Sequence, residues 1–290
     1  MGLYKIKDIE QLTGVKAHTI RIWEKRYNFF IPSRSETLIR MYSDEELTLL
    51  LKISILNKQG IKISRISEMS VQEIDKRITL LYKEDISSVH FESMLLALVE
   101  MDEILFLKIV DGLISEFGLE VTFVDYLIPF LKKIGVMWIV GSINPAQEHF
   151  ITHLIRQKLI SELNKLRIPT QKDKPFILYL PENEWHEIGL LYYNYVLRKN
   201  NIFTIYLGQS LPLESLQSCI RNYNPKALVT SIVSSMDEVA IVRYVESIKN
   251  EFPNLEIYAG GYQVDTFQSS LKKYVNIISS LDDLRRLVII

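Results

Sequence analysis

Residues 184–189 read Glu-Trp-His-Glu-Ile-Gly, and two further short motifs follow at fixed distances. Forty-one residues separate Gly189 from Ser231-Ile232-Val233, and twenty-six more separate that tripeptide from Gly260-Gly261. Each motif stands at the end of an apolar run. The first motif alone would indicate little, because a histidine beside glutamates is often only a partly exposed residue at a helix start. Together, the three motifs predict one cofactor site.

The segment 175–290 alternates apolar runs with helix-like stretches. The predicted strands are Phe176–Leu180, Ile202–Leu207, Ala227–Val233, Leu255–Ala259 and Val275–Ile278, with helices at 186–200, 212–223, 236–252 and 263–271. This alternation predicts a parallel sheet with right-handed crossovers, in a Rossmann-like or flavodoxin-like fold. Ligands of such folds lie beyond the carboxyl ends of the strands. We expect Glu184–Gly189, Gly208, Ser231 and Gly260-Gly261 to follow strand ends and meet there.

Composition excludes several classes of protein. The 290 residues are 48% hydrophobic and 24% charged, as in ordinary globular proteins with two or three domains. One cysteine, Cys219, excludes an internal disulfide and a Cys-rich zinc site, so we expect a reducing cytoplasm. The sequence has no signal-peptide pattern and no apolar run near the ~20 residues that span a bilayer, so no membrane contact is expected.

The first seventy residues carry the positive charge. They hold twelve Lys or Arg against eight Asp or Glu, and the remaining residues hold twenty-two against twenty-seven. The pattern predicts a short helix over Tyr4–Gln11, a turn at Gly14, a basic helix over 16–27, and a helix opened by the capping box Ser43–Glu46. Two short helices joined by a glycine turn are typical of a helix-turn-helix.

The sequence of this segment resembles that of the winged-helix DNA-binding domain of MerR-type regulators. The matching elements are T-G-V, T-I-R-x-W-E-x-R-Y, P-x-R and R-x-Y-S, in that order. The resemblance implies that the helix with Thr19 and Arg21 enters the major groove and that the following loop acts as a wing. Trp23 and Tyr27 are expected in the core, and Glu24 beside an arginine. The expected DNA contacts are Lys16, His18, Thr19, Arg21, Arg34, Arg40 and Tyr42.

The middle of the chain, from about 72 to 166, has helical periodicity. Four helices would make a bundle, and the more polar segment 61–87 is expected to be a linker that is partly helical. Trp138 is followed after nine residues by Glu148-His149. Such residues are commonly a core tryptophan and a solvated pair. The spacing nevertheless resembles the helical bundle that caps cobalamin in sensor proteins, which implies that Trp138, Glu148 and His149 bind the cofactor.

The three C-terminal motifs resemble the cobalamin-binding domain of methionine synthase and related mutases, with its D-x-H-x-x-G, S-x-L and G-G. The resemblance implies that His186 ligates cobalt from below and that Glu184 orients its imidazole. It also implies that Gly189, Ser231, Gly260 and Gly261 line the channel for the displaced nucleotide tail. Glu184 in place of Asp and Val233 in place of Leu are mild departures.

The whole chain is thus expected to be a multidomain α and α/β protein with three domains. They are a winged helix-turn-helix over 1–75, a four-helix bundle over 82–168, and a Rossmann-like domain over 174–290. This order resembles the CarH/LitR class of light-dependent repressors. It implies a transcriptional repressor that senses light through adenosylcobalamin, with a homo-oligomer (dimer or tetramer) controlling binding to double-stranded operator DNA.

Three points stay open at this stage. In the best-known members of that class a histidine follows the capping tryptophan, whereas this chain has Ile139, which cannot ligate. A repressor of the same architecture without cobalamin dependence, or one controlled by a protein antagonist, is an alternative. A corrinoid methyltransferase or mutase subunit is a third reading. It is disfavoured by the MerR-like domain and by the absence of a companion catalytic domain in this sequence. No phosphate loop, Ser-His-Asp triad or metal-ligand cluster points to conventional enzyme chemistry.

Overall fold

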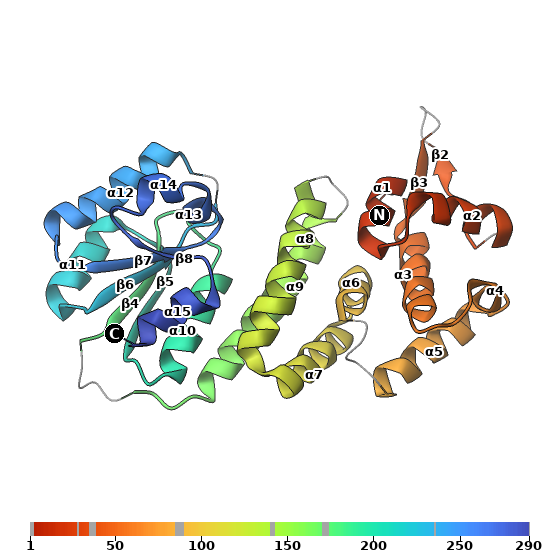
Figure 1. Ribbon diagram of the computed structural model, residues 1–290, viewed down its shortest axis with the longest axis horizontal. Coiled ribbons are helices and arrows are strands. Elements are labelled where there is room, and N and C mark those ends of the chain that lie inside the picture. The colour runs from red at the N-terminus through yellow and green to blue at the C-terminus, as the bar shows by residue number, and fades with distance from the viewer. Residues whose placement is uncertain are drawn as a thin grey trace. The chain divides into compact units, whose positions relative to one another are not determined.

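The computed structural model describes residues 3–27, 29–34, 39–84, 90–139, 143–169, 174–234 and 236–289. The chain divides into two compact units, residues 1–154 and 155–290 (Figure 1). Within the described ranges, no helix combines the length and apolar character needed to cross a membrane.

The first unit begins with a small antiparallel sheet in the order β1-β3-β2, formed by β1 (Leu3–Lys5), β2 (Ser33–Arg34) and β3 (Arg40–Ser43). Tyr4 pairs with Tyr42 in this sheet and is buried. The helix predicted from Tyr4 therefore starts later, and α1 spans Ile6–Thr13. Periodicity missed the strand because three residues are too few to show alternation.

The helix-turn-helix is confirmed. Gly14 ends α1 with φ of 72°, a left-handed conformation that glycine adopts without steric cost, and α2 (Ala17–Tyr27) follows. Trp23 and Ile20 of α2 are buried, as expected for a core face. This geometry leaves the opposite side of α2 to carry its basic residues.

Helix α3 (Asp44–Lys58) opens with the predicted capping box, in which Ser43 Oγ accepts from the Glu46 amide and Glu46 accepts from the Ser43 amide. The expected linker over 61–87 contains two helices, α4 (Ile63–Ile66) and α5 (Val71–Glu84). The polar residues of this segment lie on the outer face of α5, while Ile74 and Ile78 are buried.

Helix α6 (His90–Glu100) packs on α3. Lys58 of α3 pairs with Glu92, and Lys52 Nζ lies 2.8 Å from Glu100 and 3.1 Å from Asp75. The partly buried Lys52 ammonium thus holds α3, α5 and α6 together.

The predicted helical middle segment is confirmed. It comprises α6, α7 (Glu103–Val121), a π-helical turn η1 (Thr122–Leu127), α8 (Ile128–Ile139) and α9 (Pro145–Asn164). Gly118 interrupts α7 with φ of 79°. The Ile128 amide donates to the Phe123 carbonyl, five residues back. This wider turn comes just before Pro129, which has no amide hydrogen to continue the α-helical pattern.

The second unit is built on a parallel five-stranded sheet, as predicted, and its strand order is β5-β4-β6-β7-β8. This is the order of flavodoxin-like doubly wound folds. Its strands are β4 (Phe176–Pro181), β5 (Thr204–Leu211), β6 (Ala227–Ser231), β7 (Glu256–Gly260) and β8 (Asn276–Ile278). Its helices are α10 (Ile188–Lys199), α11 (Leu213–Tyr223), α12 (Glu238–Glu251), α13 (Tyr262–Thr266), α14 (Gln268–Leu271) and α15 (Leu281–Ile289).

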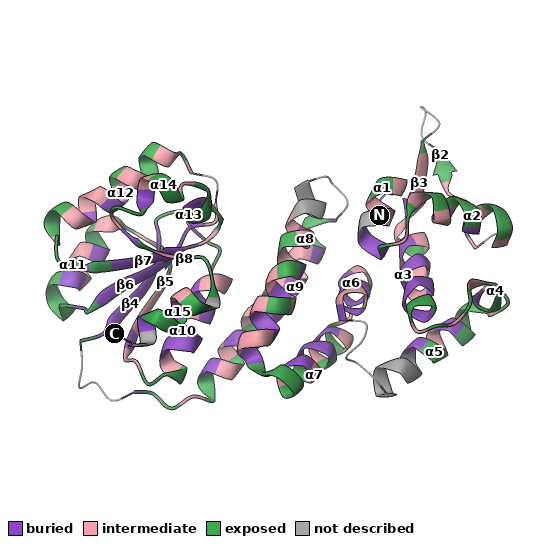
Figure 2. Cartoon of the chain, in the orientation of Figure 1, coloured by how far each residue is buried: buried purple, intermediate pink, exposed green. Residues whose placement is uncertain are grey.

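The sheet forms the buried centre of this unit, with α10 and α15 on one side and α11 and α12 on the other (Figures 1 and 2). The core on the α11 and α12 side consists of aliphatic residues such as Ile177, Leu216 and Ile241. The predicted helix over 263–271 is divided at Phe267, and α15 was not predicted.

Candidate functional site

The loop that follows β4 is organised around the buried carboxylate of Glu184. This side chain is 0% exposed, and both of its oxygens accept hydrogen bonds. One oxygen, Oε2, accepts from the amides of Val233 and Ser234 at 2.7 Å each. The other, Oε1, accepts from the Ser234 hydroxyl at 2.9 Å and from the His186 amide at 2.9 Å. Glu184 therefore joins the loop after β4 to the loop after β6.

Glu184 remains ionised in this environment. Burial alone would raise its pKa, but the hydrogen bonds from His186 and from the backbone of Ser234 and Val233 outweigh it and lower the pKa to about 2. A carboxylate that accepts several N–H bonds is expected to behave in this way.

His186 lies beside this carboxylate, and its side chain is largely exposed to solvent. Its Nδ1 is 2.7 Å from Glu184 Oε1 and 3.1 Å from the Ser234 hydroxyl, and its side chain is 59% exposed. An ionised carboxylate only accepts, so Nδ1 carries the proton and donates it. This tautomer makes Nε2 the nitrogen with a lone pair for a metal ion.

The end of β5 holds the same loop from the other side. The Ser210 amide donates to the Glu184 carbonyl at 3.1 Å, and Gln209 Nε2 donates to the Trp185 carbonyl at 2.7 Å. Gly208, expected after a strand end, instead lies inside β5. Its φ of 77° coincides with an irregular register between β4 and β5, which redirects the strand toward the loop.

Glu187 is a buried carboxylate at this site that the sequence did not reveal. Its Oε1 accepts from the Tyr206 hydroxyl of β5 at 2.8 Å, and its Oε2 accepts from Arg156 Nε of α9 at 2.6 Å. Burial and the Glu187 charge raise the pKa of Tyr206, which keeps the phenol protonated as a donor. The position beside His186 was the only sequence signal for Glu187.

The predicted channel residues Gly189, Ser231 and Gly260 gather where α10 crosses the ends of β6 and β7. A Cβ placed on Gly189 would lie 3.3 Å from Ser231 Oγ. A Cβ on Gly260 would meet the Tyr193 hydroxyl and lie 2.8 Å from the Ile278 carbonyl oxygen. Gly261 has φ of 100°, and a Cβ there would lie 2.5 Å from the Ile232 carbonyl oxygen. At Gly260 and Gly261, neighbouring atoms of the chain itself leave no room for a Cβ.

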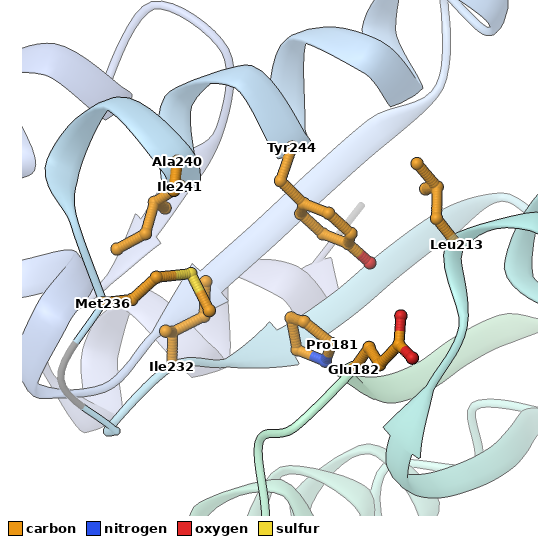
Figure 3. Close-up of a pocket in the computed structure, with 8 residues that line it drawn as sticks. All are labelled: Pro181, Glu182, Leu213, Ile232, Met236, Ala240, Ile241 and Tyr244. Atoms are coloured by element: carbon orange, nitrogen blue, oxygen red, sulfur yellow. The ribbon is translucent and has the colours of Figure 1, made fainter.

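A small cavity of about 190 Å³ lies at the carboxyl end of the sheet (Figure 3). It is lined by Pro181, Glu182, Leu213, Ile232, Met236, Ala240, Ile241 and Tyr244. Ile232 packs with α12, whereas Ser231 faces Gly189 of α10. Neighbouring residues of a strand point to opposite faces, so this cavity and the predicted channel lie on different sides of the sheet.

Glu148 and His149 lie in the first turns of α9, and Asn144 caps the start of this helix, with its Oδ1 accepting from the Ala146 amide at 2.7 Å. His149 Nε2 is 3.6 Å from Glu148 Oε2, and the two side chains are 67% and 31% exposed. The side chains of Trp138 and Ile139, at the end of α8, lie outside the described residues. The proposed cap therefore remains a prediction.

The basic residues predicted to contact DNA occupy the surface of α2 and of the strand that follows. Lys16, His18, Arg21 and Arg34 are exposed, and Thr19 is half-buried. Lys16 Nζ lies 3.0 Å from Glu10 Oε1, so its charge is partly compensated.

Tyr42 requires a correction. It was expected on DNA, but its side chain is 0% exposed and its hydroxyl donates to Glu24. Burial and Glu24 raise the pKa of Tyr42, so it is a neutral core residue. Arg40 donates from Nε to the other oxygen of Glu24 at 2.9 Å, which confirms the expected internal pair. Tyr42 thus helps to hold Arg40 in place through Glu24.

One short region of the second unit therefore collects Glu184, His186, Gly189, Ser231 and Gly260. Across the described ranges, no three His, Cys, Asp or Glu side chains converge on a common metal position. A metal ion at this loop would depend on His186 and on ligands supplied by a larger cofactor.

Known proteins match this architecture. Residues 4–72 match the family of MerR helix-turn-helix regulatory proteins, and residues 90–160 match the B12 binding domain. The HTH-type transcriptional repressor CarH of Myxococcus xanthus is 26% identical over 98% of this chain and 97% of its own length. CarA of the same organism, also named an HTH-type transcriptional repressor, is 26% identical over 89% of this chain and 86% of its own.

Among solved structures, the monomethylamine corrinoid protein of Methanosarcina barkeri has a TM-score of 0.56 and 13% identity. The match covers 70% of this chain and 97% of that protein, and it shows a shared fold. The chain therefore combines a MerR-type helix-turn-helix domain with a B12-binding domain and a Rossmann-like parallel sheet.

Proposed function

We propose that this protein is a DNA-binding transcriptional repressor that senses light through bound adenosylcobalamin, with its oligomeric state controlling operator binding. The observation that carries the proposal is the His186 imidazole held at 2.7 Å by the buried, ionised Glu184. The pairing at this site is that of a metal-ligating histidine whose other nitrogen donates to a carboxylate.

The residues of the second unit fit this role. Glu184 fixes the tautomer and orientation of His186, so that Nε2 is the cobalt ligand. Ser234 and the backbone amides after β6 keep Glu184 in position. When bound, adenosylcobalamin would supply a cobalt–carbon bond that light can break. Gly189, Ser231, Gly260 and Gly261 would line the channel for its nucleotide tail.

The first unit supplies the DNA-reading part of the proposal. Arg21 and Thr19 on α2 are the proposed base contacts, and Lys16, His18, Arg34 and Arg40 the proposed contacts to phosphate or groove edges. Support comes from the MerR match over residues 4–72 and from two relatives that are named repressors.

Trp138, Glu148 and His149 are the residues that would cover the bound cofactor. Ile139 has no ligating atom, so we propose that no stable cobalt adduct with two protein histidines forms through position 139. An illuminated protein with two protein nitrogens on cobalt would either assign the second ligand to His149 or overturn this point.

The test uses the full-length protein with adenosylcobalamin, in darkness and after illumination. Binding is expected to change the absorption spectrum, and light is expected to change both the spectrum and the molecular mass measured by light scattering. His186→Ala should weaken binding by about 100-fold or more, because it removes the ligand itself. Spectra identical to those of the free cofactor would sink the proposal.

DNA binding is tested separately, by selection from a random double-stranded library followed by titration of the selected site. Arg21→Ala should reduce affinity for that site by roughly tenfold or more, the cost of one good base contact. Lys62→Ala, on the exposed turn before α4, is the matched control for loss of one positive charge.

A further inference from the structure

Tyr193 occupies the place where the proposed cofactor channel should be open. It lies on α10 four residues after Gly189, so both residues present the same face of the helix to the sheet. Gly189 meets Ser231 at the end of β6, and the Tyr193 phenol meets Gly260 at the end of β7.

The contact with Gly260 is close. A Cβ at Gly260 would meet the Tyr193 hydroxyl and lie 3.2 Å from the ring carbon Cζ that bears it. The Ile278 carbonyl oxygen of β8 closes the other side, 2.8 Å from the same position. The phenol therefore fills the space over Gly260 that the absence of a side chain creates.

The phenol is also an uncharged part of this packing. Burial, and then the nearby Asp265 carboxylate of α13, raise the pKa of Tyr193, which keeps its hydroxyl protonated. Asp265 is itself positioned by Ser279, whose hydroxyl donates to it at 2.6 Å.

We propose that Tyr193 is the specificity-determining residue of this site, which disfavours corrinoids that carry a nucleotide tail relative to corrinoids without one. This inference rests on the proposed binding of cobalamin between α10 and the ends of β6 and β7. A nucleotide tail enters that space only when the Tyr193 side chain rotates out of it. A corrinoid without a tail needs His186 but not the channel.

The size of the effect follows from burial. Tyr193 is half-buried, so moving its side chain fully into water costs a factor of roughly ten in an equilibrium. The affinity for a complete cobalamin is lowered by that factor, and the affinity for a tailless corrinoid is not.

The experiment compares the dissociation constants of adenosylcobalamin and adenosylcobinamide, which lacks the nucleotide, for the full-length protein in darkness. Tyr193→Leu should shift the preference toward adenosylcobalamin by about tenfold. Tyr193→Met, with its adaptable side chain, serves the same purpose if the leucine variant does not fold. Tyr193→Phe keeps the ring and should leave the preference unchanged.

Tyr223→Ala on α11 is the matched control, because Tyr223 is an exposed tyrosine on the other side of the sheet. An unchanged preference in the leucine and methionine variants, with both corrinoids still bound, would overturn the role of Tyr193 and leave cobalamin binding intact. Binding of neither corrinoid by the unaltered protein would overturn the proposed function, and the role of Tyr193 with it.

Discussion

The chain contains two glutamate–histidine pairs, Glu184 with His186 and Glu148 with His149, and their surroundings differ. In the loop after β4, Glu184 is fully buried and its carboxylate accepts from the backbone of three residues and from the His186 ring. At the start of α9, Glu148 and His149 are both accessible, with 3.6 Å between Glu148 Oε2 and His149 Nε2.

Spacing explains the difference. Consecutive residues of a helix point about 100° apart and do not face each other, so Glu148 cannot cradle His149. Glu184 precedes His186 by two residues in a loop, where the chain can fold back on the carboxylate. A preorganised ligand requires such fixed partners. The first pair has them, whereas among the residues that the structure describes no buried carboxylate holds His149 in this way.

The largest expected effect comes from removing the buried carboxylate. Glu184→Ala should lower the free energy of unfolding by about 3–5 kcal/mol, because it removes a buried carboxylate and leaves the amides of the half-buried Val233 and Ser234 without their acceptor. Denaturant unfolding of the full chain measures this. Glu148→Ala, at the exposed pair, should cost less than about 1 kcal/mol. Equal losses for the two variants would mean that the carboxylates do not differ in structural role.

The pH dependence of the unfolding free energy tests the role of the buried Glu184 carboxylate in a second way. The pKa of Glu184 is lowered from 4.5 to about 2 in the folded state. Its ionised form therefore stabilises the fold fully above about pH 4.5, and this contribution is lost as the pH falls toward 2. It amounts to up to about 3 kcal/mol. The difference in unfolding free energy between the protein and Glu184→Gln should thus be larger at pH 6 than at pH 3. A difference that does not change with pH would contradict the assigned ionisation.

Glu187 shows how far sequence reasoning reaches. The strands, the three motifs and the Glu184–His186 pair could be predicted, because periodicity and spacing are local properties of the chain. The partners of Glu187 could not, since Arg156 and Tyr206 lie on α9 and β5 and meet it only in the folded unit. The prediction that Tyr42 contacts DNA was wrong for a related reason. A tyrosine in a basic segment resembles a surface contact until the pairing of β1 with β3 buries it.

The link between Glu187 and Arg156 should have a measurable coupling energy. A double-mutant cycle with Glu187→Gln and Arg156→Gln is expected to give about 1–2 kcal/mol in unfolding free energy, more than an exposed pair gives, because Glu187 is buried. The pair Arg221 and Glu251, more exposed on both sides, is the matched control and should couple by less than about 1 kcal/mol. Coupling no larger than in the control would show that Glu187 does not anchor α9 to the loop.

The smallest effect is expected at the exposed pair itself. His149→Ala should change the dissociation constant of adenosylcobalamin in darkness by less than about tenfold, because its described partner, Glu148, is accessible and does not fix the ring in the way that the buried Glu184 fixes His186. The measurement is a titration followed by absorbance, with His153→Ala, one turn further along α9, as the control.

The difference between the two pairs also predicts whether His149 matters in darkness or only after illumination. If His149 acts only after illumination, its loss alters the spectrum of the illuminated protein while dark binding persists. A loss of dark binding as large as that of His186→Ala would instead place His149 among the residues that hold the cofactor at rest, and the contrast between the two pairs would not describe their roles.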